Sequence, residues 1–245
     1  MKPQKTQGKV VRKPWGEGQL TESPTVTVLR QILVALESAA LLVDMQPRVI
    51  RNHTDYPFIF SDSPVVFYNS YYRNITDRGV LGLQTPGLQI FLPLTPKLQL
   101  MMFDPNVYTG PCLNGPFCEA INRPDVSHLN ALQLHHSSQA VYFADPDDFN
   151  YVEELYKAHR SHFIKPQAEF RIRQDVLVRG EPSDGDILHT FEPQVNHNLS
   201  LSFVSCSPVS PRDFKFSCRS PEVVDEYRRL HPTRRRNQGT QPTDK

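Results

Sequence analysis

A Ser-Asp-Ser-Pro corner between two apolar runs is the first place where the sequence could do chemistry. Asp62 stands between Phe58-Ile59-Phe60 and Val65-Val66. A carboxylate held rigidly at a strand end serves as a general base or a metal ligand. A plain turn uses the same residues, because Asp and Ser accept backbone N–H bonds and Pro fixes φ. We take Asp62 as a catalytic candidate and Ser61 and Pro64 as binding candidates, with the turn as the structural alternative.

Asn130 is a second candidate, on the inner side of a helix predicted from Asp125 onward. A buried amide must find hydrogen-bond partners, and these are either a substrate or the backbone of a neighbouring strand. Backbone anchoring is the more common use of such a residue. We keep Asn130 as a catalytic candidate beside that structural interpretation.

The histidines allow a metal site to be sketched. His159 and His162 are three residues apart, close to one helical face, and Glu154 precedes His159 by five. The preceding helix adds imidazoles at His128, His135 and His136. Adjacent helical residues point about 100° apart, so the last two cannot easily face one ion. The spacing also lacks the fixed pattern of a zincin, and we interpret the set as surface histidines. His159 stays a binding candidate, and no metal ligand is assigned.

The four cysteines do not have the spacing of a zinc site. Five residues separate Cys112 from Cys118, and eleven separate Cys206 from Cys218, against two to four in a zinc knuckle. The Gly-rich phosphate loops, the Gly-x-Ser-x-Gly elbow and His-Glu-x-x-His are missing from the sequence. The commonest nucleotide-binding, hydrolase and metalloprotease assignments are therefore excluded, and no cofactor is assigned.

The basic charge of the chain lies at its two ends. Residues 1–22 carry five Lys or Arg against two Glu, and residues 228–245 carry six against one Asp. The total is +1, so residues 23–227 hold about −7. This balance argues against a basic nucleic-acid groove in the folded part. The run Arg234, Arg235 and Arg236 is a binding candidate for nucleic acid or another acidic polymer, with a solubilising tail as the alternative.

The first long apolar segment is predicted to be a buried helix. Ser23-Pro24 has the form of an N-cap followed by Pro at the first helical position, and the helix is expected to reach about Met45. Arg30 and Glu37 interrupt the apolar stretch Val26–Val43, which argues against membrane insertion. The segment also lacks the position and cleavage site of a secretory signal. We therefore expect a soluble, cytoplasmic protein.

The next segments are predicted to be strands, then helices. Short runs rich in β-branched and aromatic residues predict strands at Val49–Arg51, Phe58–Phe60, Val65–Tyr68, Leu88–Leu92 and Leu98–Phe103. The last four form two hairpin-like pairs. An irregular insertion is expected at 104–124, and helices run from Asp125 to about Ala140 and from Asp147 to about His162, each capped by its Asp. Further strand character occurs at Glu169–Val178 and Leu199–Val204.

These elements predict an α+β fold. A largely antiparallel sheet is expected to pack against the long N-terminal helix and the pair of central helices, in a single domain over residues 24–215 with irregular loops. Residues 1–22 are expected to be a flexible leader and residues 231–245 a disordered basic tail, because their composition cannot repay the entropy of ordering.

Three stretches resemble a known family. They are Tyr56-Pro57-Phe58-Ile59-Phe60-Ser61-Asp62-Ser63-Pro64-Val65-Val66, Gln89-Ile90-Phe91-Leu92-Pro93-Leu94-Thr95-Pro96-Lys97 and His128-Leu129-Asn130-Ala131-Leu132-Gln133. In order and spacing they are similar to the bacterial and fungal family called domain of unknown function 4238, over about residues 24–160. Members typically begin with a His-aromatic-Val-Pro stretch, and residues 1–22 contain no His. The resemblance implies no activity.

Two functional hypotheses follow. The first is an intracellular binding or interaction module without catalysis, which fits the missing catalytic motifs and the acidic centre. The second is a metal-dependent hydrolase, for example a nuclease, in which Asp62, Asn130 and His159 converge on a cleft and the basic tail holds an acidic polymer. The relative positions of these three side chains discriminate between the hypotheses.

Overall fold

The computed structural model describes residues 24–75, 79–120, 122–159, 169–173, 177–178, 181–182, 187–191, 194–195, 197–215 and 217–231. Its contacts divide the chain into two units, Met1–Ala40 and Leu41–Lys245. The leader predicted at 1–22 lies outside the described residues, as does the predicted basic tail beyond His231.

Helix α1 (Pro24–Ala39) is the described part of the first unit. It begins at Pro24, as the sequence predicts, because proline is compatible with the first helical turn. The prediction that it is buried is wrong: Leu33 and Leu36 are 60% and 68% exposed. The window Thr25–Leu42 is long and apolar enough to cross a membrane, and none of it is buried. Apolar periodicity predicted the helix but not what covers it.

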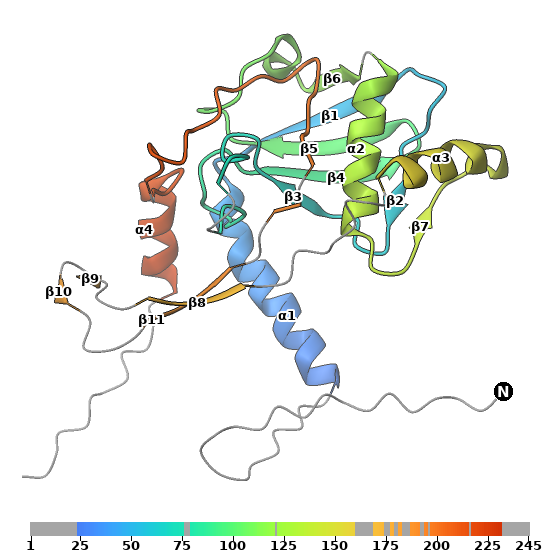
Figure 1. Cartoon of the computed structure of the whole chain (residues 1–245). Coiled ribbons are helices and arrows are strands. Elements are labelled where there is room, and N and C mark those ends of the chain that lie inside the picture. Colours follow the sequence, from blue (N-terminus) through green and yellow to red (C-terminus); the bar gives the residue numbers. More distant parts are fainter. Residues whose placement is uncertain are drawn as a thin grey trace, which may run out of the picture. The chain divides into compact units, whose positions relative to one another are not determined.

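A five-stranded sheet forms the centre of the second unit (Figure 1), with strand order β3-β4-β5-β1-β6. The strands are β1 (Gln46–Asn52), β3 (Val66–Tyr68), β4 (Gln89–Thr95), β5 (Leu98–Phe103) and β6 (Phe117–Ala120). Neighbours are antiparallel except for β1 and β6, which are parallel. The predicted α+β fold with a largely antiparallel sheet is confirmed.

One face of the sheet carries the main hydrophobic core. Along β5 burial alternates, as expected where successive side chains point to opposite faces, and Met101 and Phe103 are almost fully buried. They pack with Phe91 of β4 and with Leu129 and Leu132 of helix α2 (Arg123–His136). The sheet therefore holds α2 in a fixed position, which matters because α2 carries two of the histidines described below.

Of the two predicted hairpins, one is confirmed and one is wrong. Strands β4 and β5 form the hairpin at Pro93–Lys97. Strand β2 (Phe60–Ser61) instead pairs with β7 (Val141–Tyr142), and β3 pairs with β4. The reason is Gln133 of α2, whose side chain accepts a bond from the N–H of Ser61 and donates one to the carbonyl of Pro64. The corner between β2 and β3 is thus bonded to the helix.

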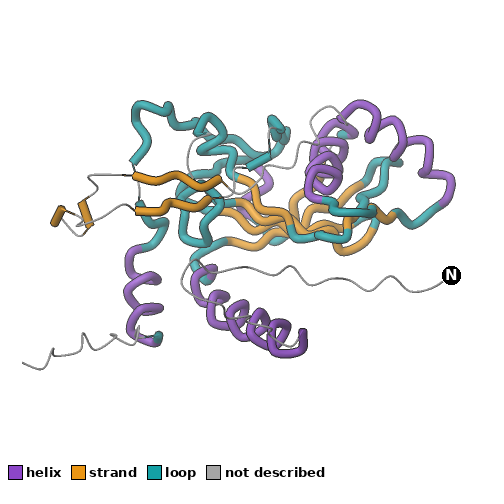
Figure 2. The backbone as a smooth tube through the Cα atoms, turned by 60° about the horizontal axis from the view of Figure 1, so that its bottom comes forward, coloured by secondary structure: helices purple, strands orange, loops and turns teal. Residues whose placement is uncertain are grey.

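The two central helices lie over the same side of the sheet (Figure 2). Helix α3 (Phe149–His159) follows a 3-10 turn at Pro146–Asp148. Both predicted caps are wrong by a few residues, because the capping side chains are Asn122 for α2 and Asp145 for the 3-10 turn. Asp125 bonds elsewhere, accepting from both the N–H and the hydroxyl of Ser202.

Two segments predicted after residue 103 differ in the structure. The expected insertion at 104–124 contains strand β6, which extends the sheet beyond β1. The segment Leu199–Val204 is not a strand, although Leu199, Leu201 and Phe203 are buried in the core. Its backbone bonds to side chains instead, for example the N–H of Leu199 to the hydroxyl of Tyr68. A period-2 apolar pattern therefore indicated burial here, not a ladder.

The remaining elements lie late in the chain. Strand β8 (Glu169–Arg173) pairs with β11 (Ile187–Phe191), and β9 (Leu177–Val178) pairs with β10 (Glu181–Pro182). Helix α4 (Pro221–Leu230) was not predicted, although Ser220-Pro221 repeats the Ser-Pro start of α1 and Ser220 caps Val223. The same local rule predicted α1 and would have found α4.

Candidate metal centre

Helix α2 places two imidazoles on one side. His128 and His135 are seven residues apart, which is two turns of an α-helix, so they lie above one another on the same face. His135 is 5% exposed. The preceding core contacts of α2 fix the axis of the helix, so both rings are held against the body of the protein.

Two further imidazoles reach this face from other elements. His159 is the last residue of α3, and His197 belongs to the irregular segment that follows the β8–β11 ribbon. The His197 ring lies 5.3–5.5 Å from the rings of His128, His135 and His159, measured between centroids. The Nδ1 atom of His128 is 3.4 Å from the Nε2 atom of His197. We call these four residues the histidine cluster.

The segment that carries His197 is anchored on both sides of the ring. The hydroxyl of Tyr68 donates to the carbonyl of His197 and accepts from the N–H of Leu199. Gln194 pairs with the backbone of Asn69 through both its amide atoms. These bonds run to buried residues at the end of β3, so the sheet itself positions His197 against α2.

The charge state of the cluster follows from its burial. Burial, and then the neighbouring rings of His135, His128 and His159, lower the pKa of His197 to about 3. Burial also lowers the pKa of His128, although the carboxylate of Asp125 acts in the opposite direction. Both rings are therefore neutral at pH 7 and carry a nitrogen lone pair, which is the form that binds a metal ion.

Three members of the cluster could hold one ion. His135, His159 and His197 each offer a ring nitrogen, and these nitrogens all lie within 4.8 Å of one another. Two nitrogens on a tetrahedral zinc ion, each at about 2.0–2.1 Å, are roughly 3.4 Å apart. The most distant pair must therefore close by up to about 1.4 Å, whereas the His128–His197 pair already has the separation found on zinc.

Two hollows adjoin the cluster, and different members of the cluster line each of them. His128 and His159 line one of about 380 Å³ together with Tyr56, Arg123, Pro124 and Ser127. His197 lines another of about 620 Å³ together with Tyr68, Arg73, Asn74, Gln194, Val195 and Asn198. Both volumes would admit a small molecule.

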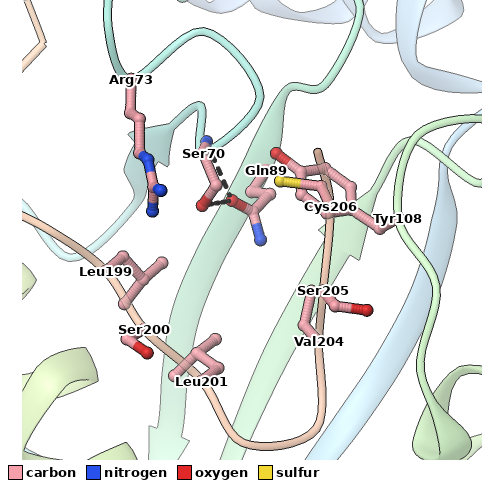
Figure 3. A pocket seen from close by; sticks show the side chains of 10 residues that line it. All are labelled: Ser70, Arg73, Gln89, Tyr108, Leu199, Ser200, Leu201, Val204, Ser205 and Cys206. Carbon is pink, nitrogen blue, oxygen red and sulfur yellow. Dashed lines mark hydrogen bonds between the residues drawn. The ribbon is translucent and has the colours of Figure 1, made fainter. Parts of the chain in front are cut away.

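A smaller cavity of about 120 Å³ lies behind the same irregular segment (Figure 3). Arg73 lies along one edge of it, with its guanidinium directed toward Leu199, and Ser70 and Gln89 are hydrogen-bonded to each other on its wall. Burial raises the pKa of the Cys206 thiol, with Arg73 acting in the opposite direction. The thiol is thus protonated at pH 7, and we do not consider it a nucleophile.

Asn130 and Asp62, the two catalytic candidates from the sequence, both bond to backbone groups. Asn130 is 1% exposed, accepts from the N–H of Ile59 at 3.1 Å and donates to the carbonyl of Pro57 at 2.8 Å. The carboxylate of Asp62 accepts from two backbone N–H groups, those of Ser138 and Gln139, at 2.7 and 2.8 Å. These contacts are the structural alternative considered for both residues.

The interpretation of the histidines as surface residues is wrong for His135, which is 5% exposed. His136 does point away, with its Nδ1 at 3.0 Å from the carbonyl of Leu132, as the 100° argument predicts. Glu154 is exposed on α3. His162, Arg234, Arg235 and Arg236 lie outside the described residues.

His197 was missed by the sequence reasoning. It follows His159 by 38 residues and stands between two asparagines, without a spacing that relates it to any helix. The i, i+7 relation of His128 and His135 was available, but it indicates only that two imidazoles share a face. Convergence of the four rings is a property of the tertiary fold.

Comparison with known proteins gives one match. The model of a protein family of unknown function, DUF4238, matches residues 30–147. No curated protein and no solved structure matches the chain. The matched range contains α2 with His128 and His135, and it ends before His159 and His197.

Proposed function

This chain belongs to the DUF4238 family, whose function is unknown, and from the geometry of the histidine cluster we propose that it is a transition-metal-binding protein. His135, His159 and His197 are the ligands. The observation that carries the proposal is the convergence of their ring nitrogens within 4.8 Å. The binding module expected from the sequence would thus be one that binds a metal ion.

The ligand type narrows the choice of ion. Imidazole suits zinc, copper, iron and nickel, whereas magnesium and calcium prefer oxygen. Zn²⁺ adds no geometric demand of its own beyond four near-tetrahedral ligands, so it tolerates a site built from three different segments. We therefore take Zn²⁺ as the expected ion. His128 supplies the fourth position, because its Nδ1 already lies 3.4 Å from a ring nitrogen of His197.

Metal binding also gives the cluster a physical role. Burial, followed by the neighbouring rings, makes the pKa of His197 low, so its protonated form is unfavourable in this cluster. A metal ion would instead be bound by the lone pairs of several neutral rings together, so no ring needs to be protonated. It would join α2, α3 and the segment around His197 into one unit.

The test is zinc titration of the chelator-treated full-length protein by calorimetry, with cobalt as a spectroscopic probe. We expect one equivalent of zinc, and tetrahedral cobalt absorption bands. His197→Gln and His135→Gln each lower the affinity at least about 100-fold. The matched control is His53→Gln, since His53 is an exposed histidine that pairs with Glu119, and it leaves binding unchanged. Equal zinc binding by the control and both cluster variants contradicts the proposal.

A second candidate function is metal-assisted hydrolysis of an ester or phosphodiester. It is favoured by the 380 Å³ hollow that His128 and His159 line, because a three-histidine zinc ion keeps an open position for an activated water. Arg123 at this hollow carries positive charge, although it is paired with Asp55. In this form of the hydrolase hypothesis the cluster replaces Asp62 and Asn130 as the reactive centre.

The two functions are separated by His128. If this ring is a ligand, His128→Gln changes the cobalt spectrum, and zinc-loaded protein does not cleave bis(p-nitrophenyl) phosphate. If the position is open, the spectrum of the variant is unchanged and the wild type cleaves this compound in proportion to its zinc content. Stoichiometric zinc without turnover supports the binding module alone.

A further inference from the structure

The exposed apolar surface of α1 has a regular repeat. Val26, Leu29, Leu33 and Leu36 follow one another at spacings of three, four and three, which is the a and d pattern of a coiled coil. All four are between 49% and 68% exposed. A helix with this stripe gains stability when another helix covers it, because burial of apolar area is the main favourable term in association.

Two charged residues flank this stripe at equivalent positions. With Val26 and Leu33 at a, Arg30 and Glu37 both occupy e, one heptad apart, and both are exposed. Charges at e and g select the partner and the orientation in coiled coils. One residue of each sign at the same heptad position indicates a partner with the same sequence.

We propose that residues 30–39 of α1 pair in antiparallel orientation with the same residues of a second copy of this chain, so that Val26 and Leu29 extend past the end of the partner's α1. In that arrangement Leu33 packs against the partner's Leu36, and Arg30 then lies opposite the partner's Glu37. The two-fold axis repeats the contact, so the pair has two such ion pairs. A parallel pair would put Arg30 opposite the partner's Thr25 and Glu37 opposite the partner's Ile32, without either ion pair.

A lipid bilayer is the main competing occupant. The window Thr25–Leu42 has the required length, but Arg30 and Glu37 lie well inside it. Charges at such positions are costly in the hydrocarbon region unless they face other protein. In an antiparallel helix pair both charged residues form ion pairs, whereas in a bilayer neither has a partner. The helix pair therefore explains the positions of Arg30 and Glu37 better than lipid does.

Charge exchange tests the orientation, with the mass of the full-length chain measured by light scattering and sedimentation. Arg30→Glu and Glu37→Arg each turn both ion pairs into repulsions, and we expect each to weaken self-association about tenfold. The double variant restores it. An equimolar mixture of the two single variants also restores it, because in the mixed pair every e position meets an opposite charge.

Apolar variants test the stripe itself. Leu33→Lys is expected to give a monomer, whereas Gln31→Lys, on the polar side of the same helix, leaves the mass of the wild type. A monomeric wild type overturns the proposal. So does a wild-type monomer that floats with phosphatidylcholine–phosphatidylglycerol vesicles, which assigns α1 to lipid. If Arg30→Glu and Glu37→Arg leave the strength of self-association unchanged, the antiparallel register is wrong. None of these outcomes depends on the histidine cluster.

Discussion

Substitution of Asn130 by alanine tests whether this buried amide belongs to the scaffold. Its side chain accepts one bond from the N–H of Ile59 and donates to the carbonyl of Pro57 and the hydroxyl of Tyr151. Asn130→Ala leaves the two backbone groups unpaired in a site that is 1% exposed. Each unpaired buried group costs about 1–3 kcal/mol, so we expect a loss of roughly 2–6 kcal/mol in the free energy of unfolding.

Urea unfolding followed by circular dichroism measures this loss. The matched control is Asn150→Ala, because Asn150 is exposed on α3 and the same chemical change there is expected to cost less than about 1 kcal/mol. Zinc affinity of the folded Asn130→Ala protein should stay within a few-fold of the wild type. A stability loss below about 1 kcal/mol, together with loss of a measured activity, would refute the scaffold role and return Asn130 to the catalytic candidates.

Three further changes have defined outcomes. Asp62→Ala removes two hydrogen bonds from exposed backbone N–H groups and should cost about 1 kcal/mol in urea unfolding; an unchanged or raised stability contradicts the turn role. Asp44→Asn disrupts the bidentate pair with Arg219, whose side chain is 1% exposed, and should lower the free energy of unfolding by about 3–5 kcal/mol. Replacing Asp44 by Leu and Arg219 by Met together should lower it less in the same assay. In chelator-treated protein the pKa of His197 is lower in the folded state than in the unfolded state. The stability that neutral His197 contributes is therefore complete above about pH 6.5 and is lost as the pH falls toward 3, at up to about 1.4 kcal/mol per pH unit. His197→Gln should flatten that slope, and a parallel slope in the variant would show that another group titrates.

The elements of the fold could be predicted where local sequence determines them. The strands before residue 104 and the two central helices follow from apolar periodicity and from turn residues. Pairing depends on groups far away in the chain. The corner at Ser61–Pro64 has the sequence of a hairpin turn, but Gln133, more than sixty residues later, takes its backbone bonds. Strand β6 was not predicted because Pro and Gly residues flank it and because its parallel partner β1 is distant in sequence.

The candidate site shows the same division between local and distant information. Asp62 and Asn130 drew attention as polar residues next to apolar segments, yet both side chains bond to backbone groups. His197 has no such local signature. Tyr68 and Gln194 anchor the segment of His197. This anchoring brings the His197 ring to the two rings of α2 and the one at the end of α3. The four rings come from three segments whose relative placement depends on the tertiary fold. A metal ion that requires all of them therefore reports on the tertiary fold as a whole, and zinc affinity should fall with any variant that detaches the His197 segment, including Tyr68→Phe, even though Tyr68 is not a ligand.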